Sequence, residues 1–179
     1  RDAQESRGLG DVYKRQGIFY GSTTGTTAGV ARQIAKELGV ADTDVHDMSK
    51  SSPSDVAPYD VLIMGTSTWG DGDMQDDAHD FADGLQDLSL KGKKVALFGC
   101  GDETMADTFC NGVEELLEYV KPTEATIVGQ FNVDGYDFSK SKSVNADGEA
   151  VGLLIDEVNH ADTVDKRIKE WCDELRKEI

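Results

Sequence analysis

The sequence predicts an α/β fold, in which helices cover both faces of a doubly wound parallel sheet. Short apolar runs alternate along the chain with longer stretches of helical period, as βαβ units do. Two of the runs, 60–65 (DVLIMG) and 94–99 (KVALFG), are apolar almost throughout, which is typical of strands buried on both faces. With 179 residues, the chain is long enough for one domain with a sizeable core.

The first half is expected to contain three strands and one helix. The apolar run 13–20 predicts the first strand, and the amphipathic stretch 26–38 predicts the helix that follows it. Residues 45–48 predict a short second strand. The third strand is expected at 60–65, inside the sheet because its run is apolar on both faces.

The second half is expected to continue the alternation. Apolar side chains at helical spacing predict helices at 76–88 and 108–120, on either side of a buried strand at 94–99. Residues 125–131 predict the fifth strand. An apolar stripe predicts the last helix at about 163–177.

The polar interval 132–150 interrupts this alternation. It is rich in Gly, Ser and Asp, and it lies between two strand-like runs, 125–131 (ATIVGQF) and 151–156 (VGLLID). A loop of this length is uncommon in a compact domain and is often functional. We therefore expect an insertion that splits the final strand.

The first sixteen residues, RDAQESRGLGDVYKRQ, differ from the rest in showing no strand or helical period before Val12. Two explanations remain open: a foreign leader that joins the domain inside its first strand, and a native disordered tail. Residues 1–11 are therefore excluded from the fold argument. Residues 12–179 are expected to form a single domain.

Charge and composition limit the classes of function. The 35 acidic and 18 basic residues give a net charge of −17, which makes nucleic acid a poor partner and a basic protein surface a good one. No run reaches the roughly 18 apolar residues of a membrane span, and the N-terminus lacks the apolar segment of a signal peptide. We expect no membrane partner and a monomer.

Cysteine and histidine spacing predicts neither a disulfide framework nor a metal site. The cysteines Cys100, Cys110 and Cys172 are odd in number and lack CxxC spacing, so a reducing cytoplasm is the simplest compartment. The histidines, at 46, 79 and 160, are far apart in the sequence. Cys100 has no base nearby in the sequence, which favours a packing role over a nucleophilic one.

Three loops are expected to carry the chemistry, because doubly wound sheets bind ligands at the carboxyl ends of their strands. These loops follow the first, third and fourth strands. They are GSTTGTT (21–27), GTSTWGDGD (65–73) and GCGDETM (99–105).

The first loop predicts a site for a monophosphate. Its backbone leads into a helix N-terminus, which favours an anion, and its hydroxyl side chains add donors. It lacks the GK[ST] ending of a P-loop and the GxGxxG fingerprint of a dinucleotide site, and it contains no Lys or Arg. The alternative is an ordinary helix cap rich in Ser and Thr.

The second loop places a large aromatic residue, Trp69, in a polar, Gly-rich turn. An aromatic side chain beside a phosphate site predicts stacking on a flat ring. The alternative is a hydrophobic residue that closes the loop.

Taken together, these segments resemble the long-chain flavodoxins, over roughly residue 17 to the C-terminus. The pieces that carry the resemblance are GIFYGSTTGTT, TSTWGDG (66–72), FGCGDE (98–103), the interrupted fifth strand and VGLLIDEVNH (151–160). The resemblance implies a flavodoxin-like five-stranded sheet of order 2-1-3-4-5, bound FMN, and an electron carrier without substrate turnover.

The resemblance also implies which residues bind the cofactor. Those expected to hold the phosphate are Ser22, Thr23, Thr24, Gly25, Thr26 and Thr27. Those expected along one face of the ring are Thr66, Ser67, Thr68, Trp69, Gly70, Asp71 and Gly72. Those expected at the other face and the pyrimidine end are Gly99, Cys100, Gly101, Asp102, Glu103 and Met105. No catalytic residue and no metal ligand is expected.

Two positions in these loops carry specific expectations. The family usually has Tyr on the second face, whereas the stretch GCGDETMADTF is one residue shorter and places Met105 nearest that position. Met can cover an aromatic face, so a less tightly stacked outer face is expected. Gly70 is expected to let the 70–71 peptide turn over toward flavin N5, because Gly adopts positive φ freely.

The implied mechanism is the transfer of single electrons by FMN, tuned by nearby charge. Acidic residues in or near the flavin loops are expected to disfavour an anionic reduced flavin and so to lower its potential; they are Asp71, Asp73, Asp76, Asp77, Asp80, Asp102 and Glu103. The acidic face would dock on basic patches of partners such as a ferredoxin/flavodoxin NADP reductase or a 2-oxoacid oxidoreductase. The alternative for 76–87 is a solvated helix face.

Two other classes remain as rivals. A quinone reductase of the same fold would reduce quinones steadily with NADH. A phosphoacceptor receiver domain would need an acidic pair after the first strand and an Asp at the end of the third. The first strand instead ends at 20–21 with Tyr-Gly, and the third at 65–66 with Gly-Thr, so the receiver pattern is missing.

Overall fold

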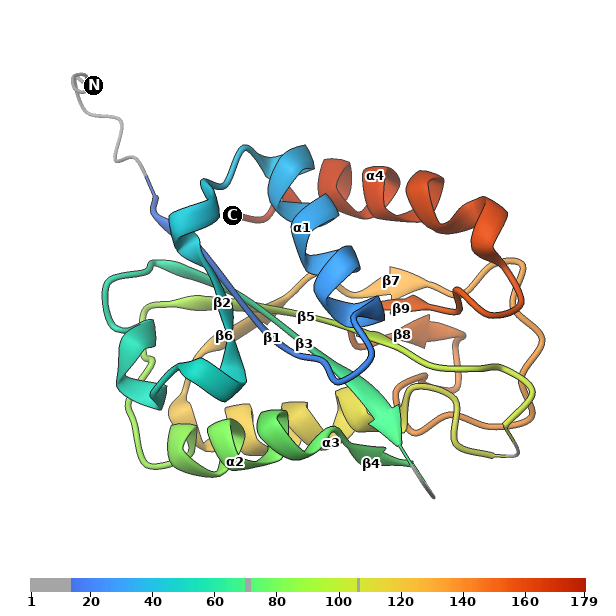
Figure 1. Cartoon of the computed structure of the whole chain (residues 1–179), viewed down its shortest axis with the longest axis horizontal. Coiled ribbons are helices and arrows are strands. Elements are labelled where there is room, and N and C mark those ends of the chain that lie inside the picture. Colours follow the sequence, from blue (N-terminus) through green and yellow to red (C-terminus); the bar gives the residue numbers. More distant parts are fainter. Residues whose placement is uncertain (1–13, 70–71, 106) are drawn as a thin grey trace.

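A parallel sheet with the strand order β2-β1-β3-β5-β6 lies at the centre of the computed structural model, which describes residues 14–69, 72–105 and 107–179 (Figure 1). Its strands are β1 (Gln16–Gly21), β2 (Val45–Asp47), β3 (Val61–Trp69), β5 (Lys94–Cys100) and β6 (Thr126–Val128). This is the order expected, with the long apolar strands β3 and β5 inside the sheet. The expected leader, 1–11, lies outside the described residues.

The fifth position of the sheet is shared by two short strands. β6 pairs with the first half of β5, where Lys94 lies opposite Thr126. β9 (Leu153–Ile155) pairs with the second half, where Phe98 lies opposite Leu153. The insertion therefore splits the final strand, as predicted.

The insertion begins inside the run expected to be one strand at 125–131. Gly129 has a φ of 81°, and its carbonyl accepts a hydrogen bond from Trp171 Nε1 (2.8 Å), so the chain turns away from β5 there. β7 (Phe131–Asn132) and β8 (Glu149–Ala150) then form a separate antiparallel pair. The prediction of a continuous strand to residue 131 is wrong for this reason.

Within the part of the chain that the structure describes, two α-helices cover each face of the sheet (Figure 1). α1 (Thr26–Leu38) and α4 (Val164–Leu175) pack on one face, and α2 (Asp76–Leu85) and α3 (Asn111–Val120) on the other. Short 3-10 helices connect them within the described residues: Asp42–Asp44, Met48–Lys50, Pro53–Val56, Lys121–Thr123 and Ala161–Thr163.

The core forms two layers because alternate side chains of each strand point to opposite faces. Phe19 and Leu62 pack under α2 and α3, whereas Ile18 and Ile63 pack under α1 and α4. All four are fully buried. Because side chains on both faces of the central strands are buried, these strands consist of continuous apolar runs in the sequence.

Several element ends differ from the sequence predictions. α3 begins at Asn111 rather than at 108, because Cys110 has a φ of 52°, outside the helical region. β3 continues past 65 to Trp69, since its end pairs antiparallel with β4 (Asp73–Met74), a strand that was not predicted. α2 ends at Leu85 rather than at 88.

Among the described helices, none combines the length and the apolar character that a membrane crossing requires.

Candidate functional site

A groove of about 350 Å³ lies where β1, β3 and β5 end, at the carboxyl edge of the parallel sheet. The three loops expected to carry the chemistry meet there, and the loop after β9 joins them. The lining residues are Thr24, Thr26, Ser67, Thr68, Trp69, Cys100, Gly101, Asp102, Glu157 and Val158. Because doubly wound sheets bind ligands at this edge, the groove is the candidate cofactor site.

Other hollows among the described residues are larger. Two of them, of about 450 and 520 Å³, are lined mainly by residues around β7 and α4, and a third, of about 430 Å³, is lined by Asp107 and by residues between 138 and 145. The first two contain Asp134 and Glu174 with further carboxylates, and they also contain basic residues, which are Lys166 and Arg167 in one and Lys177 in the other. None of these hollows brings together the loops that follow β1, β3 and β5, which is where doubly wound sheets bind their ligands.

The loop between β1 and α1 forms one end of the groove. Gly25 is the N-cap of α1 and has a φ of 97°, which Gly adopts without a Cβ penalty. Its N–H donates to Ser22 Oγ (3.1 Å), which closes the loop. No acidic side chain lies in the first turn of α1, so the positive end of the helix dipole is uncompensated by its own helix. This end of the groove suits an anion.

Hydrogen bonds fix this loop to β3 and α2. Thr27 is buried, and its Oγ1 lies 2.8 Å from Ser67 Oγ. Gln75 Nε2 donates to Thr23 Oγ1 (3.0 Å). These two threonines hold the loop in place, while Thr24 and Thr26 line the groove.

The second loop brings Trp69 to the wall of the groove. Trp69 is 44% exposed, although it ends a strand and its backbone pairs with Asp73 of β4. The large hydrophobic side chains exposed among the described residues are Trp69, Met105 and Val158, at 44%, 53% and 73%. Two of them, Trp69 and Val158, line the groove. An apolar, partly aromatic wall of this kind suits a flat ring.

Other residues of the second loop support its shape. Thr66 is fully buried, donates to Ser67 O (2.9 Å) and accepts from the Gln75 N–H (3.2 Å). Gly72 has a φ of 100°. The expectations for Gly70 and Asp71 lie outside the described residues.

The third loop contributes Cys100, Gly101 and Asp102 to the groove. Asp102 Oδ1 accepts from the Thr104 N–H (2.8 Å) and hydroxyl (2.6 Å), and these bonds hold the pKa of the Asp102 carboxyl below its usual range. Gly99 lies deeper, where an added Cβ would fall 2.2 Å from Val113 Cγ2.

Glu103 and Met105, which were also expected at this face of the ring, do not line the groove. Glu103 turns away and meets His160, and Met105 projects into solvent, with 53% of its surface exposed.

The buried thiols are held in the neutral form. Burial raises the pKa of Cys100 to about 12, and it does the same for Cys172. The pKa of Cys110 also lies well above its ordinary value, chiefly because of burial. A thiolate nucleophile is therefore unsupported at Cys100, although the residue touches the groove.

Carboxylates lie in and beside the groove. Asp102 and Glu157 line it. Asp73, Asp76 and Asp80 are exposed on β4 and α2, which continue directly from the Trp69 loop. A ligand in the groove would lie close to several negative charges.

The sheet order and the groove at its carboxyl edge define a doubly wound α/β protein that binds its ligand at the strand ends. A family model described as Flavodoxin matches residues 18–171. The chain belongs to the flavodoxin family.

Individual relatives agree with this assignment. Flavodoxin 1 of Escherichia coli is 42% identical over 164 residues, which cover 91% of this chain and 93% of that protein. A flavodoxin of Nostoc sp. is 39% identical over 167 residues, which cover 93% of this chain and 98% of that protein. These names give no support to the quinone reductase alternative.

The fold comparison points the same way. A solved structure of Fusobacterium nucleatum flavodoxin, described as bound to flavin mononucleotide, matches with a TM-score of 0.85 at 28% identity. The match covers 93% of this chain and 99% of that one.

Sequence reasoning missed part of the site. Glu157 and Val158 line the groove from the loop after β9, and Gln75, the N-cap of α2, anchors the loop between β1 and α1. The rule that ligands bind at carboxyl ends also covers the last strand, so the loop at 156–160 was predictable. The role of Gln75 was not predictable from the local sequence, because it depends on a contact with Thr23, which is 52 residues away in the sequence.

Proposed function

We infer that this protein is an FMN-dependent, low-potential electron carrier that passes single electrons between redox enzymes without turning over a substrate of its own. The observation that carries the inference is the groove itself, which combines a helix N-terminus at one end with the exposed Trp69 along its wall. Bound FMN would supply one- and two-electron chemistry there.

We assign the phosphate of FMN to the loop between β1 and α1. Thr24 and Thr26, which line the groove, would donate hydroxyl hydrogen bonds. The first-turn N–H groups of α1 would add charge-assisted bonds. Ser22, Thr23 and Thr27 would shape the loop through the contacts described above.

The flavin ring would lie against Trp69, with Ser67 and Thr68 beside it and Cys100 to Asp102 at its pyrimidine end. Gly72 and Gly99 would support the two loops from behind. Thr66 and Glu103 would not touch FMN themselves. They would hold the neighbouring backbone in place through their hydrogen bonds to the N–H groups of Gln75 and Asp137. The roles of Gly70 and Asp71 stay as predicted from the resemblance. A cover by Met105 over the outer flavin face also stays a prediction, which its 53% exposure and its position outside the groove lining do not support.

Nearby charge would decide whether the protein raises or lowers the reduction potential of the flavin. An added electron on the flavin is disfavoured by nearby carboxylates such as Asp102 and Glu157, which line the groove. This favours a low reduction potential, as does the acidic character of the whole chain.

The test is the difference in affinity between FMN and riboflavin for the apoprotein, measured by flavin fluorescence quenching. Loss of the phosphate removes charge-assisted hydrogen bonds of about 1.5–3 kcal/mol each, so riboflavin should bind at least about tenfold more weakly. In a Thr24→Ala variant, the gap between the two flavins should narrow. Equal affinities for the two flavins in the parent protein would remove the phosphate from this loop.

Flavodoxins exchange electrons with redox partner proteins. We propose that the partners of this chain present basic docking surfaces, as a ferredoxin/flavodoxin NADP reductase or a 2-oxoacid oxidoreductase would, and that the exchange takes place in the cytoplasm. The net charge of −17 supports the basic surface, because opposite charge accelerates encounter. The rate of electron transfer from such a reductase should fall as ionic strength rises, and a salt-independent rate would contradict the proposal.

A further inference from the structure

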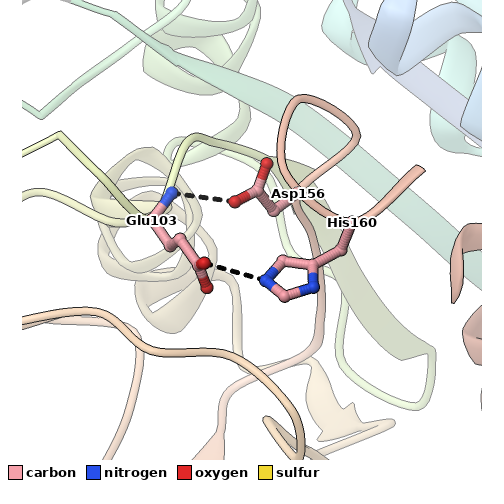
Figure 2. A group of neighbouring side chains, drawn as sticks. All are labelled: Glu103, Asp156 and His160. Carbon is pink, nitrogen blue, oxygen red and sulfur yellow. Dashed lines mark hydrogen bonds and ion pairs between the residues drawn. The ribbon is translucent and has the colours of Figure 1, made fainter. Parts of the chain in front are cut away.

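Three polar side chains from two loops, one after β5 and one after β9, meet behind the groove. Figure 2 shows Glu103, Asp156 and His160, whose ligand-type atoms all lie within 4.8 Å of one another. His160 Nε2 lies 2.8 Å from Glu103 Oε1, and the Glu103 N–H donates to Asp156 Oδ2 (3.0 Å). These contacts join the loop after β5 to the loop after β9.

Asp156 is the buried anchor of this group. It is fully buried, and its carboxylate accepts from the Glu103 N–H and from both the backbone N–H and the side-chain amide of Asn159 (2.9 and 2.8 Å). Its own N–H donates to Tyr136 Oη (3.1 Å). A buried carboxylate is tolerated when hydrogen bonds of this kind replace its water. The loop after β9 is therefore rigidly tied to the loop after β5.

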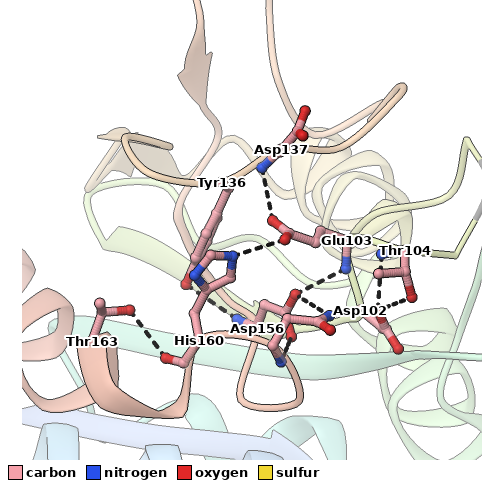
Figure 3. Close-up of polar contacts among 9 residues, drawn as sticks. Asp102, Glu103, Thr104, Tyr136, Asp137, Asp156, His160 and Thr163 are labelled. Atoms are coloured by element: carbon pink, nitrogen blue, oxygen red, sulfur yellow. Dashed lines mark hydrogen bonds and ion pairs between the residues drawn. The ribbon is translucent and has the colours of Figure 1, made fainter.

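Glu103 is held from two sides (Figure 3). Its Oε1 pairs with His160, and its Oε2 accepts from the Asp137 N–H in the insertion (2.7 Å). A carboxylate can only accept, so His160 Nε2 is the donor. The His160 ring also packs on Tyr136, with 5.0 Å between the ring centroids.

The fixed position of Glu103 matters because its neighbour in the chain, Asp102, lines the groove. Asn159 Nδ2 makes a second connection, since it donates to both Asp102 Oδ1 (2.7 Å) and Asp156 Oδ2 (2.8 Å). Asp102 and Val158 thus form one wall of the groove, and the contacts of Glu103 and His160 hold that wall from behind.

The same three side chains could suggest a metal site, but their oxygens are already in use. Both Asp156 oxygens accept N–H groups, and the two Glu103 oxygens accept from His160 and from Asp137. A metal ion would have to displace these bonds, so the geometry favours a hydrogen-bonded brace.

We propose that His160 is a positioning residue for FMN: its hydrogen bond to Glu103 braces the 101–105 segment against the 156–160 segment, and this holds one wall of the flavin groove. The proposal rests on the proposed function. A hydrogen bond to a charged group is lost when His160 is removed, so FMN should bind about tenfold more weakly, with most of the change in the dissociation rate.

The experiment compares His160→Phe with His160→Gln. Phe keeps a ring against Tyr136 but cannot donate, whereas the side-chain amide of Gln can donate to Glu103. We expect FMN affinity to fall about tenfold in the Phe variant and to stay within about threefold of the parent in the Gln variant. His79→Ala is the matched control, because His79 lies on α2 and bonds Tyr119 instead.

A second readout separates positioning from simple stability. The unfolding of each apoprotein in urea should change little between the Phe and Gln variants, while the flavin midpoint potential and the visible circular dichroism of bound FMN should differ. Equal FMN affinity and equal flavin spectra in the two variants would overturn the proposal. So would a fall in apoprotein stability with no change in FMN affinity.

Two further arms keep the test decisive. Glu103→Ala removes the same bond from the other partner, together with the bond from the Asp137 N–H. A double variant with His160→Phe should therefore bind FMN no more weakly than Glu103→Ala alone, because the bond between the two side chains is already lost there. Additive losses would overturn the brace. If EDTA treatment of the parent protein reproduces the loss seen in His160→Phe, a metal ion holds the wall, and the hydrogen-bond proposal is wrong.

The outcome is distinguishable from a failure of the proposed function. If the parent protein does not bind FMN, the proposed function fails. If the parent binds FMN and the His160→Phe variant binds it equally well, only the positioning role fails.

Discussion

Gln75 shows how one buried side chain can serve two parts of the site. It is 2% exposed and is the N-cap of α2, where its Oε1 accepts from the Ala78 N–H (3.0 Å). Its Nε2 donates to Thr23 Oγ1 and to Asp77 Oδ2 (3.0 and 2.9 Å). The amide is thus both a helix cap and a tether for the loop between β1 and α1.

Replacement of Gln75 should separate these two effects. Gln75→Ala removes the cap and the tether, so the free energy of unfolding should fall by about 0.5–2 kcal/mol and FMN should bind more weakly. Gln75→Glu keeps the acceptor for Ala78 but loses the donor and places a carboxylate beside Asp77. Urea unfolding and FMN titration check both variants. If Gln75→Glu binds FMN as tightly as the parent, the tether is unimportant.

Thr104 controls the ionisation of a groove residue. Its N–H and hydroxyl bonds lower the pKa of Asp102, so Thr104→Val should raise that pKa toward its ordinary value. The depressed pKa contributes stability above the unfolded pKa of Asp102, and this stability is lost as pH falls through the folded pKa. The variant should therefore lose stability at neutral pH relative to the parent, with the difference vanishing in strong acid.

The carboxyl carbon chemical shift of Asp102, followed by NMR through the acid range, measures the change directly. Thr104→Ser keeps the hydroxyl and is the control, which should titrate like the parent. An identical titration of Asp102 in the Val variant would contradict the assigned cause.

At the scale of elements, the backbone just before β9, where the insertion ends, lies unusually close to the backbone of β5. Gly152 lies just before β9, where an added Cβ would fall 2.0 Å from the Leu97 carbonyl oxygen of β5. Backbone atoms of a central strand cannot move aside easily. Glycine is therefore required for β9 to approach the second half of β5.

Gly152→Ala should lower the free energy of unfolding by at least about 1–3 kcal/mol, the usual cost of overpacking. Gly29→Ala is the matched control, because Gly29 lies in α1 and an added Cβ meets nothing within 4 Å. That change should stabilise the protein by up to about 1 kcal/mol, since Ala is the better helix former. Thermal and urea unfolding give both values, and a neutral Gly152→Ala variant would contradict the close approach.

Elements were predictable where a single physical pattern decides them. The helix at 26–38 and the strand at 94–99 follow from apolar periodicity, and the structure has α1 at those bounds and β5 one residue longer. The split of the fifth strand was also visible as a polar interval. In contrast, β4 and the early turn at Gly129 depend on tertiary contacts, with β3 and with Trp171.

The residues of the site also fall into those that local sequence predicts and those that depend on tertiary contacts. Gly and hydroxyl residues in strand-end loops are local signals, and they led to Thr24, Ser67 and Trp69 on the groove. The brace of Glu103 by His160 joins residues 57 positions apart, and no local pattern reports such a contact.

At the scale of the whole molecule, the net charge of −17 should weaken the apoprotein at low ionic strength. Like charges repel in the compact state, and salt screens them over about 10 Å at 0.1 M. The free energy of unfolding in urea should therefore rise between about 10 mM and 0.5 M NaCl. Neutralising exposed carboxylates, for example with Asp134→Asn and Asp147→Asn, should reduce the gain, whereas stability that is independent of salt would contradict the electrostatic argument.

The split strand has a consequence for how the protein is made on the ribosome. Domains fold as the chain emerges, N-terminal part first. β5 emerges long before β9, so the wall of the groove that follows β9 can only form when the last part of the chain has left the ribosome. We expect stalled nascent chains in which only residues up to 152 have left the ribosome to hold FMN poorly, and chains in which an added C-terminal linker has carried residue 179 out of the ribosome to hold it fully. Cofactor loading would then follow the emergence of β9 from the ribosome, and equal FMN retention by both nascent chains would rule this order out.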